Sequence, residues 1–129
     1  MPHDPYWHFW LVAFGLTVLL EAPFVLTLLR RLEPSWSRRV GLLLLANVAT
    51  HPLVWFFFPA LPFARRTNLL MSEAWAFVAE LLIYATWVSN RSSPRALRLR
   101  RAALTSLVAN AASWALGTAL VRCWGHWLF

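Results

Sequence analysis

The side chains in this sequence that could do chemistry are carboxylates, one imidazole, amides and hydroxyls set inside strongly apolar stretches. The set comprises Glu21, Asn47, Thr50, His51, Glu73, Glu80, Asn110 and Ser113. An ionisable group near the centre of a lipid-spanning helix costs about 2.5–3.5 kcal/mol, and those that are retained there commonly serve a function. Oxygen and nitrogen donors of this kind could relay protons or hold a divalent metal ion, with Glu21, His51 and Glu80 as the metal ligands.

The spacing of these polar residues places each group on one face of a helix. The stripes are Asn47–Thr50–His51–Val54, Glu73–Glu80 and Asn110–Ser113–Gly117. Separations of three, four and seven residues return to the same face of an α-helix. Counted from the span ends, Glu21 in the first stretch and members of the three stripes in the others fall within about two turns of the bilayer centre. Every stretch thus carries polar atoms near mid-depth, and the simplest arrangement points them at one another. The sequence predicts a polar site at the membrane midplane.

Two prolines follow ionisable residues inside the apolar stretches. Pro23 and Pro52 each lack the backbone N–H that would bond the carbonyl four residues earlier, which is that of Leu19 or Val48. Interrupted helices with free carbonyls at mid-depth occur at ion and substrate sites of transporters. A kink satisfied by a neighbouring Ser, Thr or Asn is the alternative.

The composition indicates that the helices carrying these residues lie in a membrane. Of 129 residues, 60% are hydrophobic and only 13% are charged, whereas soluble domains have about 25% charged residues. Four segments are long enough to cross about 30 Å of hydrocarbon. They are residues 7–29, 40–58, 69–88 and 102–121. We expect an all-α, polytopic, antiparallel four-helix bundle in which residues 1–129 form one integral membrane domain.

The arginines predict the orientation of the bundle. All twelve basic residues are arginine, and nine of them lie in the connections 30–39 and 89–101. The positive-inside rule places these two connections in the cytoplasm and both termini outside. We expect the arginines to contact anionic lipid headgroups, and we expect no nucleic-acid partner.

Local signals predict the helix boundaries. Serine caps precede the second helix, Asn68 is a candidate N-cap of the third, and Ser93 with Pro94 is a candidate start of the fourth. Six tryptophans fall near the predicted span ends, as in an interfacial belt. The tryptophans further inside, Trp55, Trp75 and Trp114, are expected to be packing residues.

The polar stripes carry a resemblance to a group of known proteins. The patterns E-A-P, N-x-x-T-H-P-x-x-W, E-x6-E and N-x-x-S begin at Glu21, Asn47, Glu73 and Asn110. In this the chain resembles small uncharacterised bacterial four-span inner-membrane proteins. The resemblance implies a bacterial inner-membrane location and no particular activity. The set is also loosely similar to the CAAX prenyl-protein proteases, but it lacks their paired-glutamate-plus-arginine motif and second histidine, so their catalytic roles are not carried over.

Three functions are compatible with these residues. The first is a protein that handles a cation or proton, as a small transporter or channel or as the membrane subunit of a larger complex, in each case with homo-oligomerisation or partners. The second is an intramembrane metal-dependent enzyme that acts on a lipid or peptide. The third is a structural or assembly subunit whose polar residues only hold helices together. Tetrapyrrole ligation by His51 is a minor variant of ligand binding.

Overall fold

The computed structural model describes residues 5–128 of the chain and is all-helical in this range. Its helices are α1 (Pro5–Leu28), α2 (Trp36–Pro52), α3 (Arg65–Trp87) and α4 (Arg95–Leu128). Three short helical segments flank α2: η1 (Leu29–Arg31) precedes it, and η2 (Leu53–Phe57) and η3 (Phe58–Ala60) follow it. Four helical stretches within 6–31, 36–60, 65–87 and 95–120 are long and apolar enough to span a membrane. The prediction of four apolar helices is confirmed.

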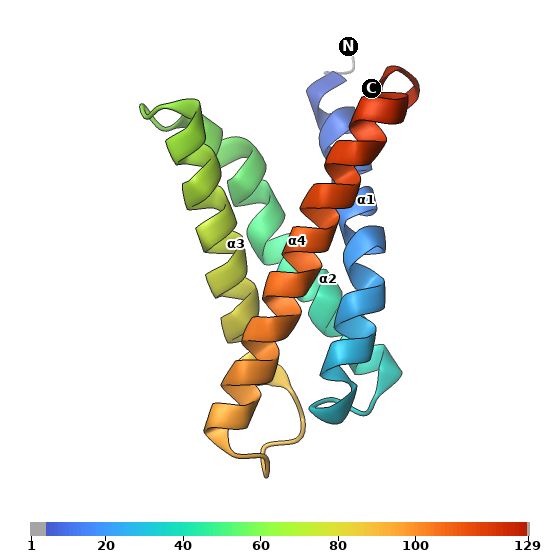
Figure 1. Cartoon of the computed structure of the whole chain (residues 1–129), viewed down its shortest axis with the longest axis vertical. Helices are drawn as coiled ribbons and strands as arrows, with labels where there is room; N and C mark the ends of the chain where they lie inside the picture. Colours follow the sequence, from blue (N-terminus) through green and yellow to red (C-terminus); the bar gives the residue numbers. More distant parts are fainter. Residues whose placement is uncertain (1–4, 129) are drawn as a thin grey trace.

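The helices form an antiparallel bundle in which each packs against two others. α1 contacts α2 and α4, and α3 contacts the same two helices. The connections between α1 and α2 and between α3 and α4 lie at one end, where nine of the arginines are located (Figure 1). The two termini and the α2–α3 connection lie at the opposite end. This arrangement gives the chain an arginine-rich end and an arginine-poor end. The side of the membrane on which each lies stays a prediction.

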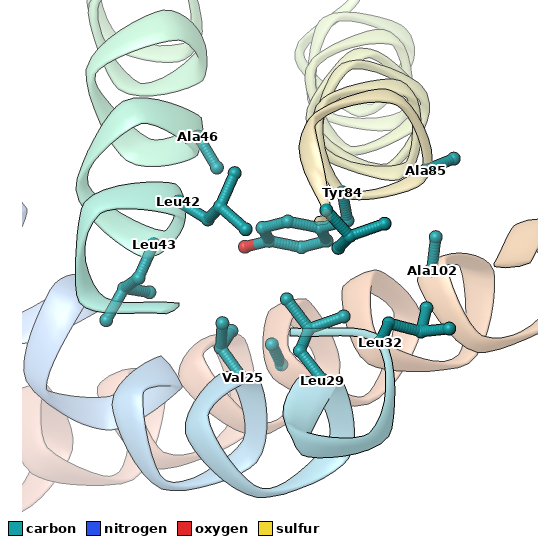
Figure 2. Packing of buried hydrophobic residues seen from close by; sticks show 11 residues of the cluster. Val25, Leu29, Leu32, Leu42, Leu43, Ala46, Tyr84, Ala85 and Ala102 are labelled. Carbon is teal, nitrogen blue, oxygen red and sulfur yellow. The ribbon is translucent and has the colours of Figure 1, made fainter. Parts of the chain in front are cut away.

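The apolar core fills the half of the bundle nearest the arginine-rich end. It is formed by Val25, Leu29, Leu32, Leu42, Leu43, Ala46, Tyr84, Ala85, Val88, Ala102 and Ala109. Figure 2 shows the Tyr84 ring between Leu42 of α2 and Leu29 of η1. In the other half the helices diverge, as Figure 1 shows. None of residues 6–20 of α1 or 110–120 of α4 is buried. The bundle is therefore closed at its arginine-rich end. At the other end these parts of α1 and α4 bury no residue, and only the segment from Phe58 to Ser72 of the described chain stays packed, with Phe58, Asn68 and Ser72 buried.

A buried carboxylate fastens the closed end. Glu33, only 1% exposed, accepts hydrogen bonds from the backbone N–H groups of Ser35 (3.2 Å) and Ser89 (2.8 Å). It also pairs with Arg38 at 3.0 Å, the one ion pair among the described residues. Burial raises the pKa of Glu33, but the hydrogen bonds from Ser89 and Ser35 and the charge of Arg38 outweigh it and lower the pKa overall. Glu33 thus ties the two arginine-rich connections together.

The local boundary signals were correct in part. The Ser35 hydroxyl accepts from the Arg38 N–H and caps α2, as expected. The Asn68 prediction was wrong, because α3 begins one turn earlier and the Asn68 amide instead donates to the Leu61 carbonyl (3.0 Å). At α4 the carbonyl of Pro94 accepts the bond from the Arg98 N–H, so the helix starts one residue later than predicted.

Candidate functional site

A polar cavity of about 170 Å³ lies among all four helices, on the loosely packed side of the apolar core. All eight residues singled out from the sequence line this cavity. They are Glu21, Asn47, Thr50, His51, Glu73, Glu80, Asn110 and Ser113. The periodicity argument that placed each stripe toward the others therefore holds as geometry. Whether these side chains bind anything stays a prediction.

Glu21 is held by donors from two other helices. Its Oε2 accepts a hydrogen bond from the Asn47 amide of α2 (2.8 Å), and its Oε1 accepts one from the Ser113 hydroxyl of α4 (3.2 Å). The second N–H of Asn47 donates to the Leu43 carbonyl (3.1 Å). Glu21 and Asn47 are each only 1% exposed. Glu21 thereby joins α1, α2 and α4 at mid-depth.

Glu80 is held in a similar way by α4 alone. Its Oε2 accepts hydrogen bonds from the Asn110 amide (2.6 Å) and the Ser106 hydroxyl (3.2 Å), and the residue is 1% exposed. The Ser113 hydroxyl also lies 3.1 Å from the Asn110 carbonyl, so its single proton can serve either Glu21 or that carbonyl. The two carboxylates therefore belong to one hydrogen-bond network that spans all four helices.

Neutral groups supply every donor to these two carboxylates. Hydroxyl and amide donors satisfy the oxygen lone pairs but bring no positive charge to offset an ionised carboxylate. The one ion pair among the described residues lies at the arginine-rich end, between Arg38 and Glu33. A carboxylate removed from water without a counter-charge is strongly disfavoured. Among the described residues, none supplies a positive charge that would offset an ionised Glu21 or Glu80.

His51 lies among aromatic rings and makes no ion pair with a carboxylate. Its ring stacks on Trp55 (centroids 5.8 Å apart, planes at 18°) and meets Phe14 edge-on (5.3 Å, 88°). Trp10 lies 6.0 Å away. The His51 Nδ1 atom is buried and finds no hydrogen-bond partner in the described part of the chain. Among the described residues, His51 therefore forms no ion pair with Glu21 or Glu80.

Thr50 and Glu73 line the cavity without joining the network. The Thr50 hydroxyl donates to the Ala46 carbonyl of its own helix (2.9 Å), and this bond holds the side chain in one orientation. Glu73 is half-buried and lies two helical turns from Glu80, on the side of the arginine-poor end.

Pro52 marks a change of helix type beside the cavity. α2 ends at Pro52 and continues as η2, a π-helical turn closed by the hydrogen bond from the Phe58 N–H to the Leu53 carbonyl. Proline cannot donate to the carbonyl of Val48, and single π-helical turns occur frequently at functional sites. The wider turn carries Trp55 to the wall of the cavity. The helix type changes directly after Pro52, whereas α1 runs from Pro5 to Leu28 through Pro23 without a break. The π-helical turn was not foreseen.

Several lining residues were missed or misassigned by sequence reasoning. Trp55 and Trp114, expected to be packing residues, line the cavity, and Thr17, Val54 and Ala76 complete it. Ser106 bonds Glu80 but was not included in the predicted site. The stripe that contains Asn110 would have found it, because residue 106 lies four positions earlier on the same face.

The metal hypothesis receives no support from the geometry. Within residues 5–128, no group of three or more His, Cys, Asp or Glu side chains is placed to hold a metal ion. Glu21, His51 and Glu80 all reach the cavity, but His51 is engaged by the aromatic rings. A metal or tetrapyrrole at these residues stays a prediction from the sequence.

The fold and the cavity define a four-helix protein of membrane-span type with a buried acidic site. No family model, no curated protein and no solved structure matches the chain. The resemblance to small bacterial four-span proteins therefore stays a sequence-based prediction.

Proposed function

We propose that this chain is a multi-pass membrane protein that binds and releases a proton or a small cation at its midplane cavity. The observation that carries the proposal is the pair of buried carboxylates, Glu21 and Glu80, whose hydrogen-bond donors are all neutral. A structural pair would be expected to include its own countercharge, because an unpaired buried charge costs several kcal/mol in practice. A site that must take its countercharge from outside is suited to cation handling.

The packing supports access from one side. The apolar core lies between the cavity and the arginine-rich end, whereas the half that leads to the arginine-poor end is loosely packed (Figure 1). With the arginine-rich end in the cytoplasm, as the positive-inside rule predicts, the site faces the outside. Glu73 then forms the entrance to the site from the outer side. Passage to the cytoplasm would require the core around Tyr84 to open.

The surroundings proposed for the protein follow from the same asymmetry. We infer a bacterial inner membrane with both termini outside, and a homo-oligomer or a larger complex as the working unit.

At the arginine-rich end, Arg91, Arg95 and Arg98 line a cavity of about 190 Å³ together with apolar side chains of α3 and α4. Guanidinium groups above an apolar floor are suited to the phosphate and upper acyl chain of an anionic lipid. Native mass spectrometry of an Arg91→Gln/Arg95→Gln variant should show weaker retention of phosphatidylglycerol than wild type.

Flux through reconstituted protein tests the proposal. Purified protein in liposomes should dissipate an imposed proton or sodium gradient faster than empty liposomes do. Glu21→Gln and Glu80→Gln should each slow that flux by about tenfold or more, and a factor of ten corresponds to about 1.4 kcal/mol. Thr86→Ala, a substitution remote from the cavity, is the control. Unchanged flux in both glutamate variants would overturn the proposal.

The alternatives make different predictions in the same assay. A structural subunit would show no flux of its own, and its Glu80→Gln variant would lose stability instead. An intramembrane metal-dependent enzyme would copurify with a metal that His51→Ala releases, which elemental analysis detects. No feature of the described residues favours either alternative over cation handling.

A further inference from the structure

An apolar groove opens beside the acidic cavity. It lies between α1 and α4, has a volume of about 490 Å³, and is lined by Phe9, Ala13, Leu16, Leu20 and Gly117 among others. Three residues, Thr17, Trp55 and Ser113, line both the groove and the cavity. The two spaces therefore meet at a shared wall, polar on one side and apolar on the other.

The shared wall brings the groove close to the carboxylate of Glu21, which lines the cavity but not the groove. Ser113 donates to Oε1 of Glu21 across this wall (3.2 Å), so the acidic group lies directly behind the groove. Trp55, whose ring stacks on His51, lines both the cavity and the groove. Aromatic faces attract cations and are commonly used to recognise quaternary ammonium groups. No arginine lines either space.

This combination selects one chemical class of ligand. A small inorganic cation would use the carboxylates and leave the groove to lipid. A phospholipid acyl chain would fill the groove, but its headgroup belongs at the interface, about 15 Å from the midplane, and would leave the carboxylates without a countercharge. A lipophilic organic cation suits both the acidic cavity and the apolar groove, because its charge meets the carboxylate and its apolar body fills the groove.

We propose that the cavity and the groove together bind one lipophilic organic cation of the quaternary ammonium or phosphonium class. Its charged centre lies between Glu21 and Trp55, and its apolar substituents lie along Leu16, Leu20 and Gly117. The inference rests on the proposed function, because the same carboxylates supply the charge. It adds the groove as the part of the site that determines specificity.

Gly117 offers a substitution that fills the groove without disturbing the protein. A Cβ atom added at Gly117 meets nothing within 4 Å, and the same is true at Gly41, which lies outside both spaces. Gly117→Leu should therefore place its side chain in the groove, and Gly41→Leu is the matched control. Both exchange an unfavourable helical glycine for leucine, so their effects on helix stability should be similar.

Equilibrium dialysis of tetraphenylphosphonium against the purified protein in a mild detergent tests the inference. We expect saturable binding of tetraphenylphosphonium by wild type and by Gly41→Leu. The affinity of Gly117→Leu and of Glu21→Gln should be about tenfold lower, which corresponds to the loss of about 1.4 kcal/mol of binding free energy. Triphenylphosphine oxide, a neutral compound of similar size, should bind weakly to all four.

The outcomes separate this inference from the proposed function. If wild type conducts protons or sodium but does not bind tetraphenylphosphonium, or if Gly117→Leu binds it as wild type does, the groove inference is wrong and the proposed function stands. Equal binding of the neutral compound would also overturn the inference. If neither glutamate variant changes the flux, the proposed function fails first.

Discussion

Glu80 is a buried carboxyl group whose charge no described residue offsets. Its Oε2 accepts from Asn110 and Ser106, and no basic group among the described residues pairs with it. A hydrogen-bonded carboxyl that only fastened helices together could be replaced by an amide without loss of function. A carboxyl that takes up a proton or cation could not. Stability and flux should therefore respond differently to the same substitution.

We expect Glu80→Gln to change the free energy of unfolding by less than about 1 kcal/mol, because the new amide oxygen accepts the Asn110 bond and hydrogen bonds between membrane helices average about 0.6 kcal/mol. Thermal unfolding in detergent measures this. Asn110→Ala, which removes the donor, is the comparison and should lower stability more. A Glu80→Gln variant that unfolds at a much lower temperature than Asn110→Ala would show that the carboxyl is chiefly structural.

At the residue scale, the sequence predicted the lining of the cavity but not its internal contacts. The i, i+3, i+4 and i+7 spacings determine which side chains share a face, so Glu21, Asn47 and Asn110 could be assigned to one site. The aromatic surroundings of His51 depend on Phe14 and Trp10 of another helix. Contacts of this kind depend on how helices are placed against one another, which no spacing within a helix reveals.

At the scale of elements, the hydrogen bonds of Glu33 join two connections that are far apart in sequence. Glu33 and Ser89 are 56 residues apart, and neither lies in a predicted span. This contact could not be predicted from the sequence, because a single glutamate in a polar loop is ordinarily solvated. The Asn68 prediction failed for a related reason, since a good capping residue also satisfies a nearby carbonyl from inside the helix.

The lowered pKa of Glu33 sets the direction of a pH effect. Because the pKa in the folded protein lies below the ordinary value of 4.5, the stabilisation by Glu33 is complete above pH 4.5 and is lost as the pH falls through the lowered pKa. Glu33→Gln should therefore cost on the order of 1–2 kcal/mol at neutral pH, where hydrogen bonds to a charged group are lost. Unfolding temperatures of both proteins should converge in acid. An equal difference at neutral and acidic pH would contradict this.

The π-helical turn after Pro52 gives a second test at this scale. Pro52→Ala restores a backbone N–H that can bond the Val48 carbonyl and continue α2 as a regular helix. Continuation would rotate Trp55 away from the cavity wall, so flux should fall although thermal stability stays the same or rises. Pro59→Ala, in η3, is the control because Pro59 does not line the cavity. Unchanged flux in Pro52→Ala would show that the interruption has no role in the site.

The whole molecule is asymmetric along its long axis, with a sealed arginine-rich end and a loosely packed opposite end (Figure 1). The sequence predicted four helices and their antiparallel order from hydropathy and connection length. The divergence of the outer halves could not be predicted, because it depends on small differences in packing along each helix. If the predicted orientation is correct, the site opens to the outside.

The single cysteine tests that orientation. Cys123 is exposed near the end of α4, at the arginine-poor end. A membrane-impermeant maleimide added to intact cells should label it, and Cys123→Ser combined with Ser92→Cys, in the α3–α4 connection, should be labelled only after the cells are opened. The reverse pattern would place the termini in the cytoplasm.

The central claim is that Glu21 and Glu80 carry an exchangeable proton or cation as their countercharge. Infrared spectroscopy of the reconstituted protein detects the carbonyl stretch of a protonated carboxyl group directly. In buffer without small cations, wild type should show this band at neutral pH, each of Glu21→Gln and Glu80→Gln should weaken it, and added sodium or tetraphenylphosphonium should reduce it in wild type. A spectrum without the band, or one that neither substitution changes, would contradict the account.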